Sequence, residues 1–311
     1  MGDLMELNKI FKNIIENNIV YTQHGKVATY IPELAKANPN DLGVYVITLD
    51  NQEFYAGNYD KKFTMQSVSK VLALILSLMD NGETKVFEKV GMEPTGDSFN
   101  SIVDLELKNI HKPFNPMINA GAIATTSLLN GSSNEEKTAR ILDLARRLSH
   151  NPDIMINENV YLSEKLTGDR NRSIAYFMKS FNVIEGNVED ILDVYFKQCS
   201  IEVTCKDIAN IGCVLANDGI STKTGESIVP KEICRITKTL MSTCGLYDAS
   251  GEFAVHIGIP AKSGVGGGIM AAVPRKMGIG VYGPALDEKG NSIAGIQILR
   301  ELSEKLDLDI Y

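Results

Sequence analysis

The chain has 311 residues, of which 44% are hydrophobic and 23% charged, and its net charge at pH 7 is −8. This composition is ordinary for a globular protein with a sizeable core. Because Asp and Glu outnumber Lys and Arg, no positive excess is available to neutralise phosphates, which disfavours binding to nucleic acid or to an anionic membrane. We expect a small-molecule partner instead.

The sequence lacks the patterns of export, membrane insertion and metal binding. Its first residues are too polar for a signal-peptide core, and no apolar run is long enough to span a bilayer, so we expect a cytoplasmic protein. The five cysteines form no Cys-x-x-Cys pair and are expected to be reduced thiols in the core. The four histidines lie far apart, so we expect neither a metal ion nor another cofactor.

The first predicted elements are a helix and a hairpin. Apolar residues recur at helical spacing from Leu4 to Ile15, which predicts an amphipathic helix. Two strand-like runs follow, Val44 to Leu49 and Glu53 to Gly57. The turn-forming pair Asp50-Asn51 joins them, which predicts a β-hairpin as the first part of a sheet.

From about Thr64 to Gly245 nearly every segment has a helical pattern. Side chains that can cap the start of a helix stand at Asn115, Asn187 and Thr204. Residues that can adopt a positive φ follow apolar runs at Asn81-Gly82, Asn130-Gly131, Asp218-Gly219 and Gly245. We therefore expect a helical subdomain over residues 64–245.

After this block the hydrophobic period shortens again. Three short segments separated by Gly and Pro predict strands at Phe253 to Ile257, Ile269 to Val273 and Gly278 to Tyr282. A final helix is expected from Ser292 to about Leu306.

This order of elements predicts one catalytic domain over residues 1–311, of the α/β (α+β) class. An antiparallel sheet built from both termini, residues 1–63 and 246–311, would be flanked by helices, and the all-helical subdomain would be inserted into it. The site is expected between the two parts.

A candidate nucleophile lies where the segment from Phe63 to Leu76 turns from polar to apolar, a pattern that predicts a buried helix. Ser67 lies in its first turn, where free amides and the helix dipole favour developing negative charge. Lys70 shares that face and can reach the Ser67 hydroxyl. Burial would lower the pKa of Lys70 and make its neutral amine a base for the serine. A Ser-x-x-Lys string also arises by chance, so the motif needs structural context.

A second motif supports the nucleophile. Lys262-Ser263-Gly264 opens a glycine-rich run between two apolar strand-like segments. It is similar to the Lys-Thr/Ser-Gly strand that faces the serine in penicillin-recognising enzymes and class A β-lactamases. The copy at Lys223-Thr224-Gly225 lies in a polar loop and is better interpreted as a turn. Residues 278–283 match Gly-x-Gly-x-x-Gly, but Pro284 follows and no helix starts there, so a dinucleotide site is not predicted.

Longer strings carry a family resemblance. The chain resembles the serine-dependent glutaminases of the β-lactamase/transpeptidase-like fold, and the matching strings keep that family's order over residues 25 to 268. The longer ones are Gly25 to Ala35, Ser67 to Lys70, Glu93 to Gly96, Asn119 to Ile123 and Lys262 to Gly268. The Ser-Asp-Asn element of β-lactamases is absent, which favours the glutaminase branch over penicillin chemistry.

The resemblance implies hydrolysis of the side-chain amide of L-glutamine to L-glutamate and ammonia, through a glutamyl ester on Ser67. Lys70 would take the serine proton, and the backbone amides of Ser67 and Val265 would form the oxyanion hole. Tyr247 would relay a proton to the leaving ammonia, with Tyr195 close by.

The resemblance also implies a set of substrate-binding residues and a homodimer or homotetramer. The residues expected to hold the amino and carboxylate groups of the substrate are Tyr30, Asn119, Glu164, Asn171 and Tyr195, alongside Ser67, Tyr247 and Val265 at its reacting end. Ordinary structural roles also suit these residue types, such as a solvated acid for Glu164 or core aromatics for the two tyrosines.

Three functional alternatives stay open. One is another serine amidase or peptidase of the penicillin-recognising fold. Another is a non-catalytic protein that binds an amino acid, and the last is a preference for asparagine over glutamine.

Overall fold

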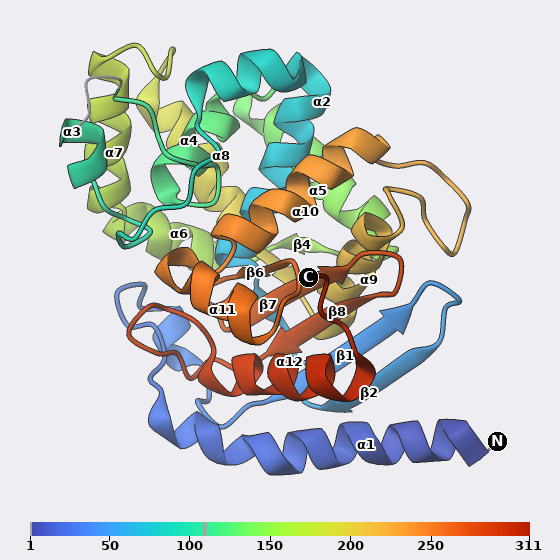
Figure 1. Cartoon of the computed structure of the whole chain (residues 1–311). Coiled ribbons are helices and arrows are strands. Elements are labelled where there is room, and N and C mark those ends of the chain that lie inside the picture. Colours follow the sequence, from blue (N-terminus) through green and yellow to red (C-terminus); the bar gives the residue numbers. More distant parts are fainter. Residues whose placement is uncertain (1, 108–110) are drawn as a thin grey trace.

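One five-stranded antiparallel sheet joins the two ends of the chain in the computed structural model, which describes residues 2–107 and 111–311 (Figure 1). Its strand order is β2-β1-β8-β7-β6. Strands β1 and β8 pair directly, with Tyr45 opposite Gly280, so the N-terminal and C-terminal segments share one sheet, as predicted. The strands are β1 (Gly43–Thr48), β2 (Glu53–Gly57), β6 (Ala261–Ser263), β7 (Gly268–Val273) and β8 (Met277–Tyr282).

Alternate residues of the sheet enter two different cores, as the two-residue period of a strand requires. Val44 and Val46 of β1 pack in one core with α1 (Gly2–Asn18) and α12 (Ile293–Leu306). Tyr45 and Ile47 belong to the other core, which includes the middle helices. Figure 1 shows α1 and α12 beneath the sheet and the helical block above it.

The predicted hairpin, the strands β7 and β8 and the last helix are confirmed, but the predicted strand at Phe253 to Ile257 is wrong. These residues lie in and directly after α11 (Ser250–His256). Phe253 and Ile257 are four residues apart and both buried, whereas Val255 between them is 81% exposed. A strand would have placed all three on one face, so a helical period explains the burial.

The middle of the chain is mostly helical, as predicted. It contains α2 (Lys70–Lys89), α3 (Val103–Leu107), α4 (Asn119–Ser127), α5 (Asn134–Ser149), α6 (Glu158–Thr167), α7 (Asp169–Ser180), α8 (Val188–Cys199), α9 (Cys205–Ala216) and α10 (Lys231–Cys244). It is not entirely helical, because β4 (Met155–Ile156) and β5 (Ile201–Val203) form a small sheet with β3 (Phe63–Thr64). Short 3₁₀ turns occur at Ile19–His24, Leu34–Lys36, Gln66–Ser69 and Tyr247–Ala249.

Two of the predicted helix starts have the expected capping bonds. The Asn187 side chain accepts from the amides of Glu189 and Asp190 at the start of α8, and Thr204 forms a capping box with Asp207 at the start of α9. The predicted start at Asn115 is too early, because α4 begins at Asn119. The Asn115 side chain instead accepts a hydrogen bond from the Met117 amide in a local turn.

The glycines predicted to end helices act in different ways. Gly82 has φ 75° and ψ 166°, which are non-helical, so it ends the first helical part of α2 at a kink, as predicted. Gly219, with φ 88°, follows the end of α9. Gly245 ends α10 with φ −74°, so it does not use the left-handed region.

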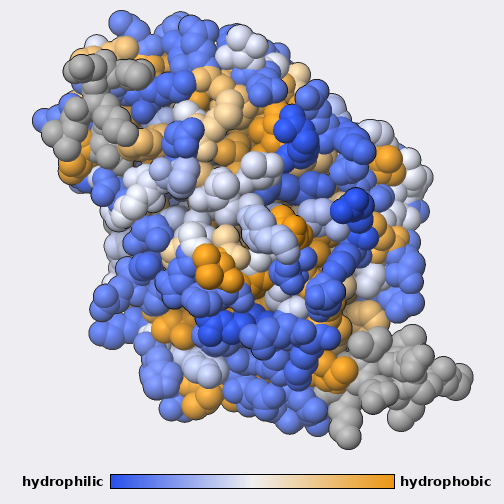
Figure 2. All heavy atoms as spheres, viewed as in Figure 1, coloured by the Kyte–Doolittle hydropathy of each residue, from blue (hydrophilic) through white to orange (hydrophobic). Residues whose placement is uncertain are grey.

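Polar residues cover most of the face shown in Figure 2, where hydrophobic residues form separate groups. No helix among the described residues is long and apolar enough to cross a membrane. The five cysteines are free and buried, as predicted. Within the described ranges, no group of three His, Cys, Asp or Glu side chains could hold a metal ion.

Candidate active site

Ser67 is buried where β3 turns into the long helix α2. It lies in the 3₁₀ turn Gln66–Ser69 rather than in the first turn of the α-helix itself. Gln66 has φ 48°, an uncommon conformation for a residue with a side chain, so the chain bends sharply just before the serine. A Cβ on Gly264 would lie 3.3 Å from the Ser67 amide nitrogen. The Lys-Ser-Gly segment therefore approaches the serine closely, as its glycine allows.

Lys70 is completely buried at the start of α2. Its Nζ donates hydrogen bonds to the Met117 carbonyl at 3.1 Å and to Asn119 Oδ1 at 2.7 Å. Burial lowers the pKa of Lys70 to about 7, although the charges of Cys199 and Glu164 oppose the shift. The amine is thus available in neutral form near neutral pH, which a general base requires.

Tyr247 contacts the candidate nucleophile. Its hydroxyl donates to the Ser263 carbonyl at 3.1 Å and also hydrogen-bonds with the Ser67 side chain. Burial raises the pKa of Tyr247, and the bond with Ser67 partly offsets that rise. Tyr247 has φ 57°, so this turn is also held in a conformation uncommon for a residue with a side chain.

Two of the candidate substrate-binding residues are hydrogen-bonded to each other, and a third has a free carboxyl oxygen. Asn119 Nδ2 donates to Asn171 Oδ1 at 2.9 Å, so the two amides and Lys70 form one chain of hydrogen bonds. Glu164 is buried, and its Oε1 has no hydrogen-bond partner among the described residues. Burial raises the pKa of Glu164 to about 8, although a bond from Gln66 and the Lys70 charge lower it. A carboxylate in this setting can receive a cationic group.

Tyr30 and Val265 line a cavity of about 660 Å³ whose walls also include Phe99, Asp287 and Gly290. Tyr30 is 55% exposed as a residue. Burial nevertheless raises the pKa of its hydroxyl, and the charges of Tyr247 and Glu164 add to the rise. Burial also raises the pKa of Tyr195, and the charges of Cys199 and Glu164 add to the rise. Interactions thus link the predicted residues in part: Tyr247 bonds with Ser67, Lys70 with Asn119, and the Glu164 charge acts on Tyr30 and Tyr195.

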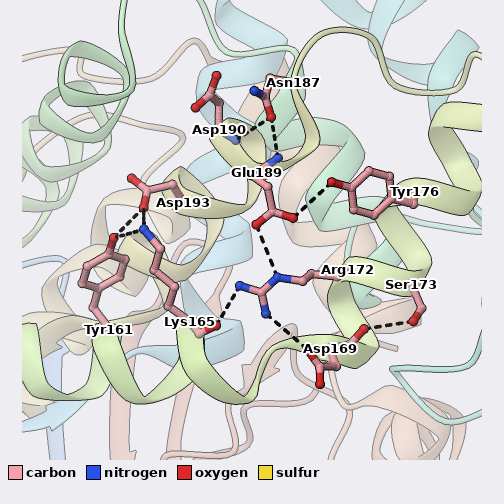
Figure 3. Close-up of polar contacts among 10 residues, drawn as sticks. All are labelled: Tyr161, Lys165, Asp169, Arg172, Ser173, Tyr176, Asn187, Glu189, Asp190 and Asp193. Atoms are coloured by element: carbon pink, nitrogen blue, oxygen red, sulfur yellow. Dashed lines mark hydrogen bonds and ion pairs between the residues drawn. The ribbon is translucent and has the colours of Figure 1, made fainter.

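Three helices that carry the candidate substrate-binding side chains are linked to one another on their outer side (Figure 3). Asp193 of α8 accepts from Lys165 of α6 at 2.6 Å and from Lys197 at 2.7 Å. Arg172 of α7 bonds to the Lys165 carbonyl at 2.8 Å and to Glu189 of α8 at 3.3 Å. Lys165 and Arg172 directly follow Glu164 and Asn171 in the chain, so this network fixes the position of their helices.

Sequence reasoning missed two residues of this site. Gln66 hydrogen-bonds to Glu164, and its position directly before the serine was the available signal. Lys262 is a completely buried lysine that contacts the Tyr247 ring, although the sequence assigned it only to a motif.

The antiparallel sheet, the helical block and a Ser-x-x-Lys turn facing a Lys-Ser-Gly strand define a protein of the β-lactamase-like fold. A crystal structure of a probable glutaminase from Bacillus subtilis superposes with a TM-score of 0.92 at 40% identity, covering 100% of this chain and 98% of that chain. A structure of the covalent complex between the Bacillus subtilis glutaminase and 5-oxo-L-norleucine, formed by reaction with 6-diazo-5-oxo-L-norleucine, superposes with a TM-score of 0.89. It is 40% identical and covers 97% of this chain and 98% of that chain.

The sequence comparisons identify the family. A family model described as glutaminase matches residues 25–311. Glutaminase 2 from Clostridium perfringens (strain 13 / Type A) is 64% identical over 305 residues, which cover 98% of this chain and 100% of the relative. The chain therefore belongs to the glutaminase family, as the resemblance predicted. Its reaction class is hydrolysis of the glutamine side-chain amide.

Proposed function

We propose that this enzyme hydrolyses L-glutamine to L-glutamate and ammonia through a glutamyl ester on Ser67. The observation that carries the proposal is the buried Ser67 itself, with Lys70 three residues further along the chain and the Tyr247 hydroxyl in hydrogen-bond contact. The covalent complex of the Bacillus subtilis glutaminase with 5-oxo-L-norleucine supports a covalent route in a relative.

In the first half of the proposed reaction, the neutral Lys70 amine takes the Ser67 proton as Oγ attacks the amide carbon. Met117 and Asn119 hold the amine in place. The backbone amides of Ser67 and Val265 stabilise the oxyanion. Tyr247 passes a proton to the nitrogen and is reprotonated by the Lys70 ammonium, so that ammonia leaves and the ester remains. Water then attacks the ester, the neutral Lys70 amine takes a proton from the water, and this proton is returned to Ser67 Oγ as glutamate leaves.

The remaining polar groups are proposed to hold the ammonium and the carboxylate on the α-carbon of the substrate. Glu164, with one oxygen free of hydrogen-bond partners among the described residues, is suited to the substrate ammonium. Asn119 and Asn171 can donate to its carboxylate. We assign the hydroxyls of Tyr30 and Tyr195 to the ammonium, together with Glu164, because the Glu164 charge acts on both tyrosines.

The test is ammonia release from L-glutamine by the Ser67→Ala variant. We expect kcat to fall by about 10³-fold or more, because no other group supplies the nucleophile. Ser77→Ala is the matched control: Ser77 is also buried, lies in α2 directly after the serine turn, and its hydroxyl has no partner among the described residues. Wild-type turnover in Ser67→Ala, with Ser77→Ala also normal, would remove Ser67 from the mechanism.

Selectivity, assembly and location stay predictions. Turnover of L-asparagine measured beside L-glutamine would test the preference for the longer side chain. Light scattering would test the expected homodimer or homotetramer, and cell fractionation the expected cytoplasmic location.

A further inference from the structure

Lys262 of β6 is a second fully buried lysine beside the proposed site. Its Nζ donates to the Gly245 carbonyl at 2.9 Å and to the Ser263 carbonyl at 2.6 Å. Lysines are almost never fully buried unless they are paired. The hydrogen bonds of Lys262 go to backbone carbonyls rather than to a carboxylate, so its burial calls for an explanation.

Both carbonyls lie next to Tyr247, one at its hydroxyl and the other in its turn. The Ser263 carbonyl is also the acceptor for the Tyr247 hydroxyl, at 3.1 Å. The Gly245 carbonyl also accepts the Ser263 amide at 3.1 Å, and it stands two residues before the tyrosine. In addition, Lys262 Nζ lies 4.3 Å from the centroid of the Tyr247 ring. One amino group therefore contacts the turn, the ring and the hydroxyl acceptor of the same tyrosine.

The Tyr247 turn needs such support. Tyr247 has φ 57°, a conformation that costs free energy for a residue with a side chain. The turn is also pressed against β6, because a Cβ on Gly245 would lie only 1.7 Å from the Ala261 carbonyl oxygen. Phe99 packs against the ring, with the two centroids 4.7 Å apart. Neither feature fixes the direction of the hydroxyl, whereas the carbonyl shared with Lys262 does.

We propose that Lys262 is a positioning residue for Tyr247, holding the tyrosine hydroxyl in the orientation that meets Ser67. The proposal rests on the proton-relay role proposed for Tyr247. Because Lys262 acts through the tyrosine and is enclosed by β6 and the Gly245–Tyr247 turn, it affects the proton-transfer step more than substrate binding. Small displacements of a reacting group are enough to cost a large factor in rate.

The experiment is a double-mutant cycle with Lys262→Met and Tyr247→Phe. Met keeps most of the side-chain volume and removes the donors. We expect Lys262→Met alone to lower kcat by about tenfold or more while KM for L-glutamine changes by less than about twofold. In the Tyr247→Phe background, the same change should lower kcat by less than about twofold, because no hydroxyl is left to position.

Lys238→Met is the control for losing a buried lysine. Lys238 is also buried, and its Nζ bonds to Asp218 at 3.1 Å in a different part of the fold. We expect its kcat to stay near the wild-type value. If Lys262→Met does not fold, Lys262→Gln, which can still donate, takes its place in the cycle.

The outcomes separate this inference from the proposed function. Unchanged kcat in Lys262→Met, or an equal loss with and without the Tyr247 hydroxyl, would overturn the positioning role alone. Wild-type kcat in Tyr247→Phe by itself would overturn the relay role of the tyrosine and the inference with it.

Discussion

Lys70 and Glu164 are buried ionisable side chains, and burial disfavours the charged form of each. It lowers the pKa of Lys70 to about 7 and raises the pKa of Glu164 to about 8. Burial thus leaves the Lys70 amine able to accept a proton. It also means that the ionised form of Glu164 requires a nearby cation. The ammonium of an amino acid would supply that cation and return Glu164 to its ionised form.

We expect kcat for L-glutamine to rise with pH through about 7 and to fall about tenfold per unit below it. Protonated Lys70 cannot accept the serine proton, and kcat reports groups in the enzyme–substrate complex. The measurement is a pH profile of the wild type and of Glu164→Gln. The Gln variant should raise KM and keep the rising limb, or move it slightly to lower pH. A wild-type kcat that does not change between pH 6 and 8 would exclude Lys70 as the titrating base.

At the scale of elements, three helices must keep their mutual positions for the substrate-binding side chains to converge. Asp193 provides one link, since it lies on α8 and accepts from Lys165 of α6 (Figure 3). Partial burial raises the pKa of Asp193, but hydrogen bonds from Lys165, Lys197 and Tyr161 outweigh this and lower it to about 2. The ionised aspartate therefore stabilises the folded state.

We expect Asp193→Asn to lower the free energy of unfolding by about 1–2 kcal/mol at pH 7. The sign follows from linkage: the contribution is complete above the unfolded pKa of about 4 and is lost as pH falls towards 2. Urea unfolding at pH 7 measures the change. Asp169→Asn is the control, because the Asp169 side chain is 94% exposed and solvent screens its ion pair with Arg172. Equal stability of the two variants would contradict this role for Asp193.

At the scale of the whole molecule, α9 connects the helical block to the sheet built from both termini. It lies directly on β8, where glycines replace larger side chains. A Cβ on Gly280 would lie 2.1 Å from the Cys205 carbonyl oxygen, and one on Gly278 would lie 2.0 Å from that of Ala209. These glycines allow the helix and the sheet to approach, and the backbone atoms facing them have little freedom to move away.

We expect Gly280→Ala to destabilise the protein by about 2–3 kcal/mol, because the added methyl group forces α9 away from β8. Gly251→Ala serves as the control, since it lies in α11 and a Cβ there would meet nothing within 4 Å. Alanine should be neutral or slightly stabilising at that position. Guanidinium unfolding of both variants checks the difference, and a Gly280→Ala midpoint equal to that of Gly251→Ala would show that the close approach is not required.

Local signals in the sequence predicted much of this architecture. The hairpin, the caps at Asn187 and Thr204 and the final helix depend on neighbouring residues, and they occur where expected. The segment from Phe253 to Ile257 was misassigned because five residues of mixed polarity fit a strand or a helix until their burial is known. The small sheet was missed because its strands, two or three residues long, show no period.

The sequence by itself determined the family and most of the order of the elements, and it predicted the pairing of Ser67 with Lys70, since these depend on strings and spacings along the chain. Only the tertiary structure decided the bond between Gln66 and Glu164 and the contact of Lys262 with Tyr247. Gln66 and Glu164 are far apart in sequence, and α8, which packs against both α6 and the serine turn, brings them near each other. The proposed role of Lys262 depends on backbone carbonyl groups. Every residue has such a group, so the sequence does not indicate which ones folding will place around the amine.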